Sequence, residues 1–145
     1  VSPVSRIPRR FISSRERMRL LTHDPVLGHI TTFGGHPIPC VAGNAALEVL
    51  IEENLAENAR RMGTLFQELL IHPSIKEVRG LGLMLAVELG DAEIVQRVVM
   101  GCLGRGILGF WFLSCPTAFR IAPPLTIDES LVREACAAIL AELDR

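Results

Sequence analysis

A short segment at residues 28–37 brings together the kinds of groups that bind a phosphate dianion. Thr31 and Thr32 supply adjacent hydroxyls, and Gly34 and Gly35 leave the backbone open to close approach. A proline then begins a predicted helix, whose free N–H groups point back toward the segment. These features predict an anion site, and the alternative interpretation is a plain tight turn.

A second glycine-rich segment, GRGILG at residues 104–109, matches the pattern G-x-G-x-x-G letter for letter. The dinucleotide-binding fingerprint needs a strand before the glycines and a helix after them, so that the pyrophosphate meets the helix N-terminus. Here a predicted helix precedes the glycines and a predicted strand follows them. Because the order is reversed, we do not expect this segment to bind a nucleotide.

Other polar side chains fit structural roles better than chemical ones. His36 and Cys40 could share a helix face as zinc ligands, but no second closely spaced pair accompanies them, so we expect no metal site. Ser114 and Cys115 lie between predicted strands without a nucleophile elbow or a paired base, and we expect no nucleophilic role for them. Lys76 is the single lysine among the 15 basic residues, so a mechanism that needs a reactive lysine has one candidate here.

Length and composition indicate a globular chain. The sequence has 145 residues, 49% hydrophobic and 21% charged, which excludes a disordered chain. Its formal net charge of −1 implies no general affinity for nucleic acid. The four cysteines lie far apart in the sequence and indicate reduced thiols in a cytoplasmic protein. No apolar run reaches the roughly 18 residues that a membrane helix needs.

Hydrophobic periodicity predicts the elements that must position these residues. Ser13 or Ser14 caps a short helix over 15–21, and residues 40–71 form one long helix or two with a break near Asn54. The early part of that stretch is small and apolar nearly all round, which predicts burial on more than one side. From residue 75 onward the predicted order is strand, strand, helix, strand, strand, helix. The strands cover 76–80, 83–89, 107–113 and 118–122, and Asp91 and Asp128 cap the helices. This is a small α+β layer with helices on one face of a sheet.

Three motifs, in order along the chain, give the sequence a family resemblance. They are GHITTFGGHPIPCVAGNAALEVL at 28–50, VRGLGLMLAVEL at 78–89 and FRIAPPLTID at 119–128. Together they resemble the class III pyridoxal-phosphate-dependent aminotransferases, the family of ornithine, acetylornithine and 4-aminobutyrate aminotransferases. The resemblance covers the chain from about Phe11 to Arg145.

The resemblance implies an α/β fold of the fold type I class, with this chain as its C-terminal portion. Residues 1–36 then correspond to a remnant of the large cofactor-binding domain, of which 1–10 depart from the family. Residues 37–72 correspond to a connecting helix or helices, and residues 73–145 to the small C-terminal α+β domain.

The resemblance also implies roles for particular residues. The family's threonine in the TFGG motif binds the cofactor phosphate of the neighbouring subunit, and here this residue is Thr32, with Thr31 as its helper. Arg120 matches the arginine that grips a substrate carboxylate, which suits the fork of a guanidinium. The alternative for Arg120 is a surface ion pair. The resemblance thus implies a homodimer with pyridoxal 5'-phosphate as cofactor, and an amino donor and a 2-oxo acid as small-molecule partners.

The sequence departs from the family in the region of the catalytic lysine. The family's Schiff-base lysine precedes a glycine-rich stretch, and alignment places it just upstream of Val1, while residues 1–10 contain no glycine. Lys76 lies in the small-domain region and cannot stand in, so we expect no catalytic residue in this chain. His36 replaces the usual asparagine of the GGNP motif. We therefore expect transamination of an amino acid or ω-amine with a 2-oxo acid only as part of a full-length dimer, with this chain inactive by itself.

Two alternatives stay open at this stage. A chain without the lysine is also a candidate for a non-catalytic remnant that acts as a dimerisation or interaction module. A mutase or racemase of the same fold would share these motifs, and fold-level analogy does not separate it from an aminotransferase. The sequence does not specify the amino donor, because the pocket walls that select it lie mostly upstream in the family.

Overall fold

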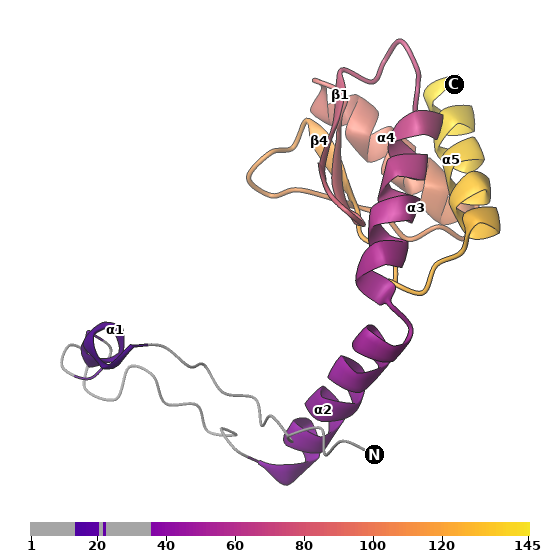
Figure 1. Cartoon of the computed structure of the whole chain (residues 1–145). Coiled ribbons are helices and arrows are strands. Elements are labelled where there is room, and N and C mark those ends of the chain that lie inside the picture. The colour runs from indigo at the N-terminus through magenta and orange to yellow at the C-terminus, as the bar shows by residue number, and fades with distance from the viewer. Residues whose placement is uncertain (1–13, 21, 23–35) are drawn as a thin grey trace. The chain divides into compact units, whose positions relative to one another are not determined.

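The computed structural model of the chain describes residues 14–20, 22 and 36–145, so Thr31 and Thr32 lie outside the described residues (Figure 1). The chain divides into two compact units, residues 1–53 and 54–145. Among the described helices, none is both long and apolar enough to cross a membrane.

In the first unit, α1 (Arg15–Arg19) begins after Ser14, whose hydroxyl accepts a hydrogen bond from the Arg17 N–H at 3.3 Å. Of the two serines that the sequence predicts as caps, Ser14 is the one that caps α1. The second helix, α2 (Pro37–Glu52), has proline at its start, where no N–H is needed. No residue of α2 is buried, so the predicted burial is not met within the described part of the chain. The helix instead presents apolar surface.

The long helical stretch is two helices, which settles the alternative left open by periodicity. Asn54 adopts a left-handed conformation with φ of 50° between α2 and α3 (Leu55–Leu69). Asparagine tolerates this region better than most residues because its short polar side chain bonds locally. The boundary between the two units falls at the same place.

The second unit is an antiparallel sheet with helices on one side (Figure 1). Its spatial strand order is β1-β2-β4-β3, and α3, α4 and α5 lie on one face. The elements after α3 are β1 (Glu77–Leu81), β2 (Met84–Glu88), α4 (Ala92–Gly104), β3 (Phe110–Trp111), β4 (Ala118–Ile121) and α5 (Glu129–Leu143). This is the predicted order, and the side chains of Asp91 and Asp128 cap α4 and α5 as expected.

The predicted strand over 107–113 is much shorter than expected, and its first residue is used by the end of α4. Gly106, with φ of +82°, donates to the Leu103 carbonyl at 3.0 Å, and Ile107 donates to the Cys102 carbonyl at 2.9 Å. This pair of bonds is a Schellman motif, which satisfies the last carbonyls of a helix. Gly106 of GRGILG therefore ends α4, and of residues 107–113 only Phe110 and Trp111 form β3.

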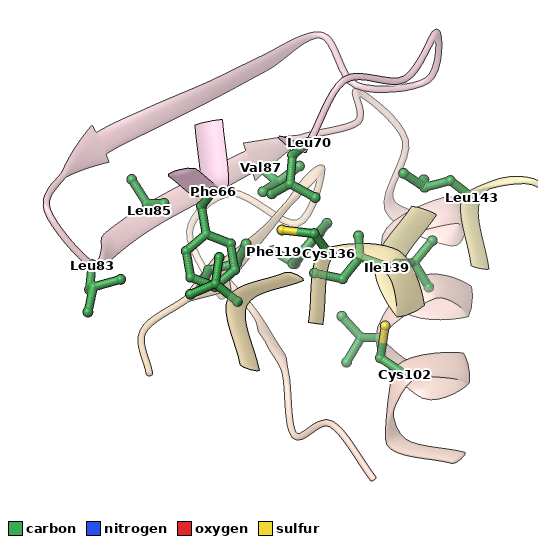
Figure 2. Packing of buried hydrophobic residues seen from close by; sticks show 14 of the residues in the cluster. Phe66, Leu70, Leu83, Leu85, Val87, Cys102, Phe119, Cys136, Ile139 and Leu143 are labelled. Atoms are coloured by element: carbon green, nitrogen blue, oxygen red, sulfur yellow. The ribbon is translucent and has the colours of Figure 1, made fainter. Parts of the chain in front are cut away.

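The core lies between the sheet and the three helices of the second unit (Figure 2). Leu85 and Val87 of β2 and Phe119 of β4 point into it and are at most 3% exposed. The helices contribute buried side chains that include Phe66, Val98, Val132, Cys136 and Ile139. Burial of this apolar surface is the main force that holds the sheet to the helices.

A close approach of two backbones joins α3 to the β1–β2 hairpin. The hairpin turns through a two-residue loop whose first residue, Gly82, has φ of +55°. A Cβ atom placed on Gly63 of α3 would overlap the Gly82 carbonyl oxygen. Glycine at position 63 is therefore required for this contact.

We expect Gly63→Ala to destabilise the second unit by about 1–3 kcal/mol, because the new methyl group must displace backbone rather than a flexible side chain. The midpoint of urea unfolding measures this loss. Gly104→Ala is the matched control, since no atom lies within 4 Å of a Cβ there. Equal urea midpoints for the two variants would show that the hairpin does not closely contact α3 at position 63.

A buried carboxylate joins α4 to α5. The Glu142 side chain is 3% exposed and accepts a 2.6 Å bond from Arg105 Nε, while Arg145 Nη1 lies 3.3 Å from its second oxygen. The Arg105 bond, with Arg145 in support, lowers the pKa of Glu142 below its ordinary value. A Cβ on Gly101 would overlap this carboxylate, so the small residue in α4 makes room for it.

The lowered pKa of Glu142 predicts a pH-dependent stability. Its contribution is present above the ordinary glutamate value of about 4.3 and is lost as pH falls through the lowered folded-state pKa. Glu142→Gln should lower the thermal midpoint near neutral pH, and the gap from the parent chain should narrow in acid. Glu129→Gln, which removes an exposed carboxylate paired with Arg133, is the control and should show a smaller gap. A gap for Glu142→Gln that stays constant with pH would contradict the assignment.

Candidate functional site

The candidate site lies on the face of the sheet that the helices leave open. Successive residues of a strand point to opposite faces. In β4, Phe119 and Ile121 are buried against the core, whereas Arg120 is exposed on the other side. Figure 1 shows all three helices of this unit on the core side of the sheet. Strand alternation thus places the predicted carboxylate-binding residue on the open face.

The strand register sets the neighbours of Arg120. Ala86 of β2 lies opposite it on one side and Phe110 of β3 on the other. The Arg120 guanidinium carbon is 5.8 Å from the centre of the Phe110 ring, within the range of a cation–π interaction. Arg79 of β1 lies opposite Ala86 in turn, so one row across the sheet reads Arg79, Ala86, Arg120, Phe110.

The two arginines of this row differ in their counter-ions. Arg79 has carboxylate oxygens of Glu77 and Glu88 each 3.2 Å from its guanidinium. Arg120 has no carboxylate partner among the residues that the structure describes, and its guanidinium lies beside the Phe110 ring. Arg79 is therefore neutralised locally, while Arg120 keeps its charge and its N–H donors for another group.

Glu88, beside this row, is held as an ionised carboxylate. A hydrogen bond from the Thr117 hydroxyl, followed by bonds from the Gly90 N–H and Arg79, lowers the pKa of Glu88. The Cys115 sulfur lies 3.6 Å from a Glu88 oxygen. A carboxylate with a lowered pKa is a weak base, so this contact does not give Cys115 an activating partner.

Exposed apolar side chains share the open face with Arg120. Leu81 and Met84 are opposite each other at the end of the β1–β2 hairpin and are 88% and 73% exposed. Phe110 is 51% exposed. The face therefore combines one unneutralised guanidinium with apolar surface, which suits a small ligand that carries a carboxylate on a partly apolar body.

Lys76, another candidate residue of the second unit, does not lie on this face. Lys76 precedes β1, and its ammonium group lies against Gly90. Strand alternation groups Lys76 with Val78, on the opposite face from Arg79 and Arg120. Within the described ranges, no group of three histidine, cysteine or acidic side chains is arranged to hold a metal ion. His36 is the residue before α2, and the phosphate-binding expectation for Thr31 and Thr32 falls on residues outside the description.

Sequence reasoning missed two features. One is a cavity of about 370 Å³ between α4, β4 and α5, lined mainly by core side chains and bordered by Arg105, Arg120 and Glu134. The other is the Phe110 ring, whose centre lies 5.8 Å from the Arg120 guanidinium carbon. The signal that finds Phe110 is the strand register, which a single sequence does not supply.

Comparison with known proteins identifies the family. The model of the family "Aminotransferase class-III" matches residues 10–143. Ornithine aminotransferase 1 of Staphylococcus aureus is 36% identical over 145 residues, which cover 94% of this chain and 32% of the relative. Acetylornithine aminotransferase of Haemophilus ducreyi is 40% identical over 118 residues, or 79% of this chain and 29% of the relative. The chain thus spans about a third of the length of these curated relatives.

Solved structures agree with the sequence relatives. An aminotransferase from Bacillus anthracis superposes with a TM-score of 0.74 at 28% identity, over 83% of this chain and 31% of that one. Ornithine aminotransferase from Toxoplasma gondii gives a TM-score of 0.72 at 34% identity, over 88% and 30% of the two chains, in a crystal described with partial occupancy of pyridoxal phosphate at the active site. The predicted fold class is confirmed by these neighbours. On the match over residues 10–143 and these relatives, the chain belongs to the class III aminotransferase family.

Proposed function

We propose that this chain is part of a pyridoxal-phosphate-dependent aminotransferase that transfers an amino group between an amino acid or ω-amine and a 2-oxo acid. The observation that carries the proposal is Arg120, which keeps an unneutralised guanidinium on the open face of the sheet. A carboxylate is common to amino acids and 2-oxo acids. One arginine can therefore hold an amino acid or a 2-oxo acid through two parallel hydrogen bonds.

The described residues fit the substrate side of such a site and not the covalent anchor of the cofactor. Pyridoxal phosphate, when bound, supplies an electron sink for the amino acid. Arg120 would orient the carboxylate of the substrate, and Thr32 with Thr31 would hold the cofactor phosphate across a dimer interface. Lys76 is the single lysine of the sequence and lies against Gly90, away from the face of Arg120. We therefore propose that residues 1–145 by themselves do not catalyse transamination.

The dimer is part of this proposal, and the surface of α2 supports it. Ile38, Val41 and Ile51 are 65–74% exposed, and no residue of α2 is buried. A helix that is apolar on most sides is normally covered by another surface. In the proposed organisation, residues 1–36 belong to the cofactor domain, 37–72 connect it, and 73–145 form the small domain. The same surface favours the second candidate function, a non-catalytic interaction module.

Pyruvate binding tests the carboxylate role. In the 145-residue chain with ¹⁵N-labelled arginine, pyruvate should move the side-chain N–H resonance that Arg120→Gln removes, while pyruvamide, which lacks the carboxylate, should not. Arg133→Gln is the matched control, because it removes an exposed guanidinium already paired with Glu129. Pyruvate binding that survives Arg120→Gln would overturn the role of Arg120.

The activity of the isolated chain tests whether transamination needs a lysine other than Lys76. With pyridoxal phosphate, L-ornithine and 2-oxoglutarate, we expect no 2-oxo acid consumption above that of the cofactor in buffer. The reason is that Lys76 does not share the face of Arg120. A rate that exceeds the buffer background and disappears in Lys76→Arg would contradict this expectation.

Self-association tests the role assigned to α2. Sedimentation of the parent chain should show a concentration-dependent dimer, which Val41→Asp should weaken because it places a charge in the apolar contact. Leu113→Asp is the matched control, since Leu113 is 95% exposed and lies outside α2. A chain that remains monomeric at every concentration would count against the dimer, as would equal effects of the two substitutions.

A further inference from the structure

We propose that Phe110 is a positioning residue, which holds the Arg120 guanidinium ready to receive a carboxylate. This inference rests on the proposed role of Arg120 and adds to it a second residue, from a different strand. The site would then be a cross-strand pair rather than one exposed arginine.

Strand pairing brings Phe110 and Arg120 together. The two residues are directly opposite each other in the antiparallel pair β3–β4, so their side chains leave the same face a few ångströms apart. The guanidinium carbon lies 5.8 Å from the ring centre. The other residue of β3, Trp111, is opposite Phe119, so strand alternation directs it to the other face of the sheet, where it is 41% exposed. Of the two residues of β3, Phe110 is therefore the one that can reach Arg120.

An aromatic ring restrains an arginine without neutralising it. The ring attracts the guanidinium through its π face and consumes none of the N–H donors. Arg79, in the same row, shows the other way to hold an arginine: Glu77 and Glu88 occupy its donors and cancel its charge. A carboxylate partner for Arg120 would hold the side chain equally well but would compete with an incoming carboxylate. Phe110 avoids this competition.

The expected benefit is preorganisation. An arginine side chain loses rotamer freedom when it binds a ligand in one geometry. An arginine held by a neighbouring ring has lost part of that freedom before the ligand arrives, so ligand binding costs less conformational entropy. Removing the ring while keeping its apolar bulk should weaken carboxylate binding by about 2- to 10-fold. The substitution should not change the charge of the site.

The experiment compares Phe110→Leu with Phe110→Tyr in the 145-residue chain. Leucine keeps an apolar side chain without a π face, and tyrosine keeps the face. Two quantities are measured by NMR with ¹⁵N-labelled arginine: the ring-current displacement of the Arg120 side-chain N–H resonance, and the affinity for pyruvate. Trp111→Leu is the matched control, because it removes the neighbouring aromatic residue of the same strand from the opposite face.

We expect Phe110→Leu to abolish the ring-current displacement and to weaken pyruvate binding, and Phe110→Tyr and Trp111→Leu to preserve both. If Arg120→Gln abolishes pyruvate binding while Phe110→Leu leaves the affinity unchanged, the positioning role is wrong and the carboxylate role stands. If pyruvate binding survives Arg120→Gln, both proposals fail. If Phe110→Leu does not fold, Phe110→Met replaces it as an apolar side chain without a π face.

Discussion

Burial of one face of the β1-β2-β4-β3 sheet is the constraint on which the open face depends. Val87 and Phe119 are opposite each other in the register and lie in the core with at most 3% exposure. Because side chains alternate along a strand, a slip of one residue would turn Phe119 to solvent and Arg120 into the core. The cost of burying an unpaired guanidinium excludes that arrangement. The position of the candidate site is thus a consequence of apolar packing on the other side of the sheet.

Charge on the open face is distributed unevenly between its two arginines, Arg79 and Arg120. Arg79 belongs to a network with Glu77 and Glu88, in which each charge has a nearby opposite. Arg120 lies across Ala86 from that network and contacts an aromatic ring instead. Exposed ion pairs contribute little to stability, so the network is better understood as local neutralisation. What remains on the face for a ligand is the guanidinium of Arg120.

The glycine-rich segment at 104–109 shows that the same glycine spacing has different roles in different structural contexts. The GRGILG letters match a nucleotide fingerprint, yet Gly106 supplies the left-handed residue that ends α4. The same turn places Arg105 against the buried Glu142 of α5. One segment thus ends a helix, anchors a second helix and leads into β3, and the helix end accounts for the glycine at position 106.

Local features of the sequence were sufficient for much of this structure. Capping by Asp91 and Asp128 and the order of elements after residue 75 follow from short-range patterns, and the motif around Arg120 indicated both the family and the candidate residue. Periodicity could not decide between one helix and two around Asn54, because the break is a single backbone conformation.

Tertiary structure determined which side chains contact one another. Which strands are neighbours, and in which register, decides that Arg79 is neutralised and Arg120 is not, and that the Phe110 ring lies beside Arg120. Ile107 does not join β3, because its N–H bonds to the Cys102 carbonyl at the end of α4. These outcomes depend on contacts between segments distant in sequence. Residue types determine which elements form, and only packing determines which side chains meet.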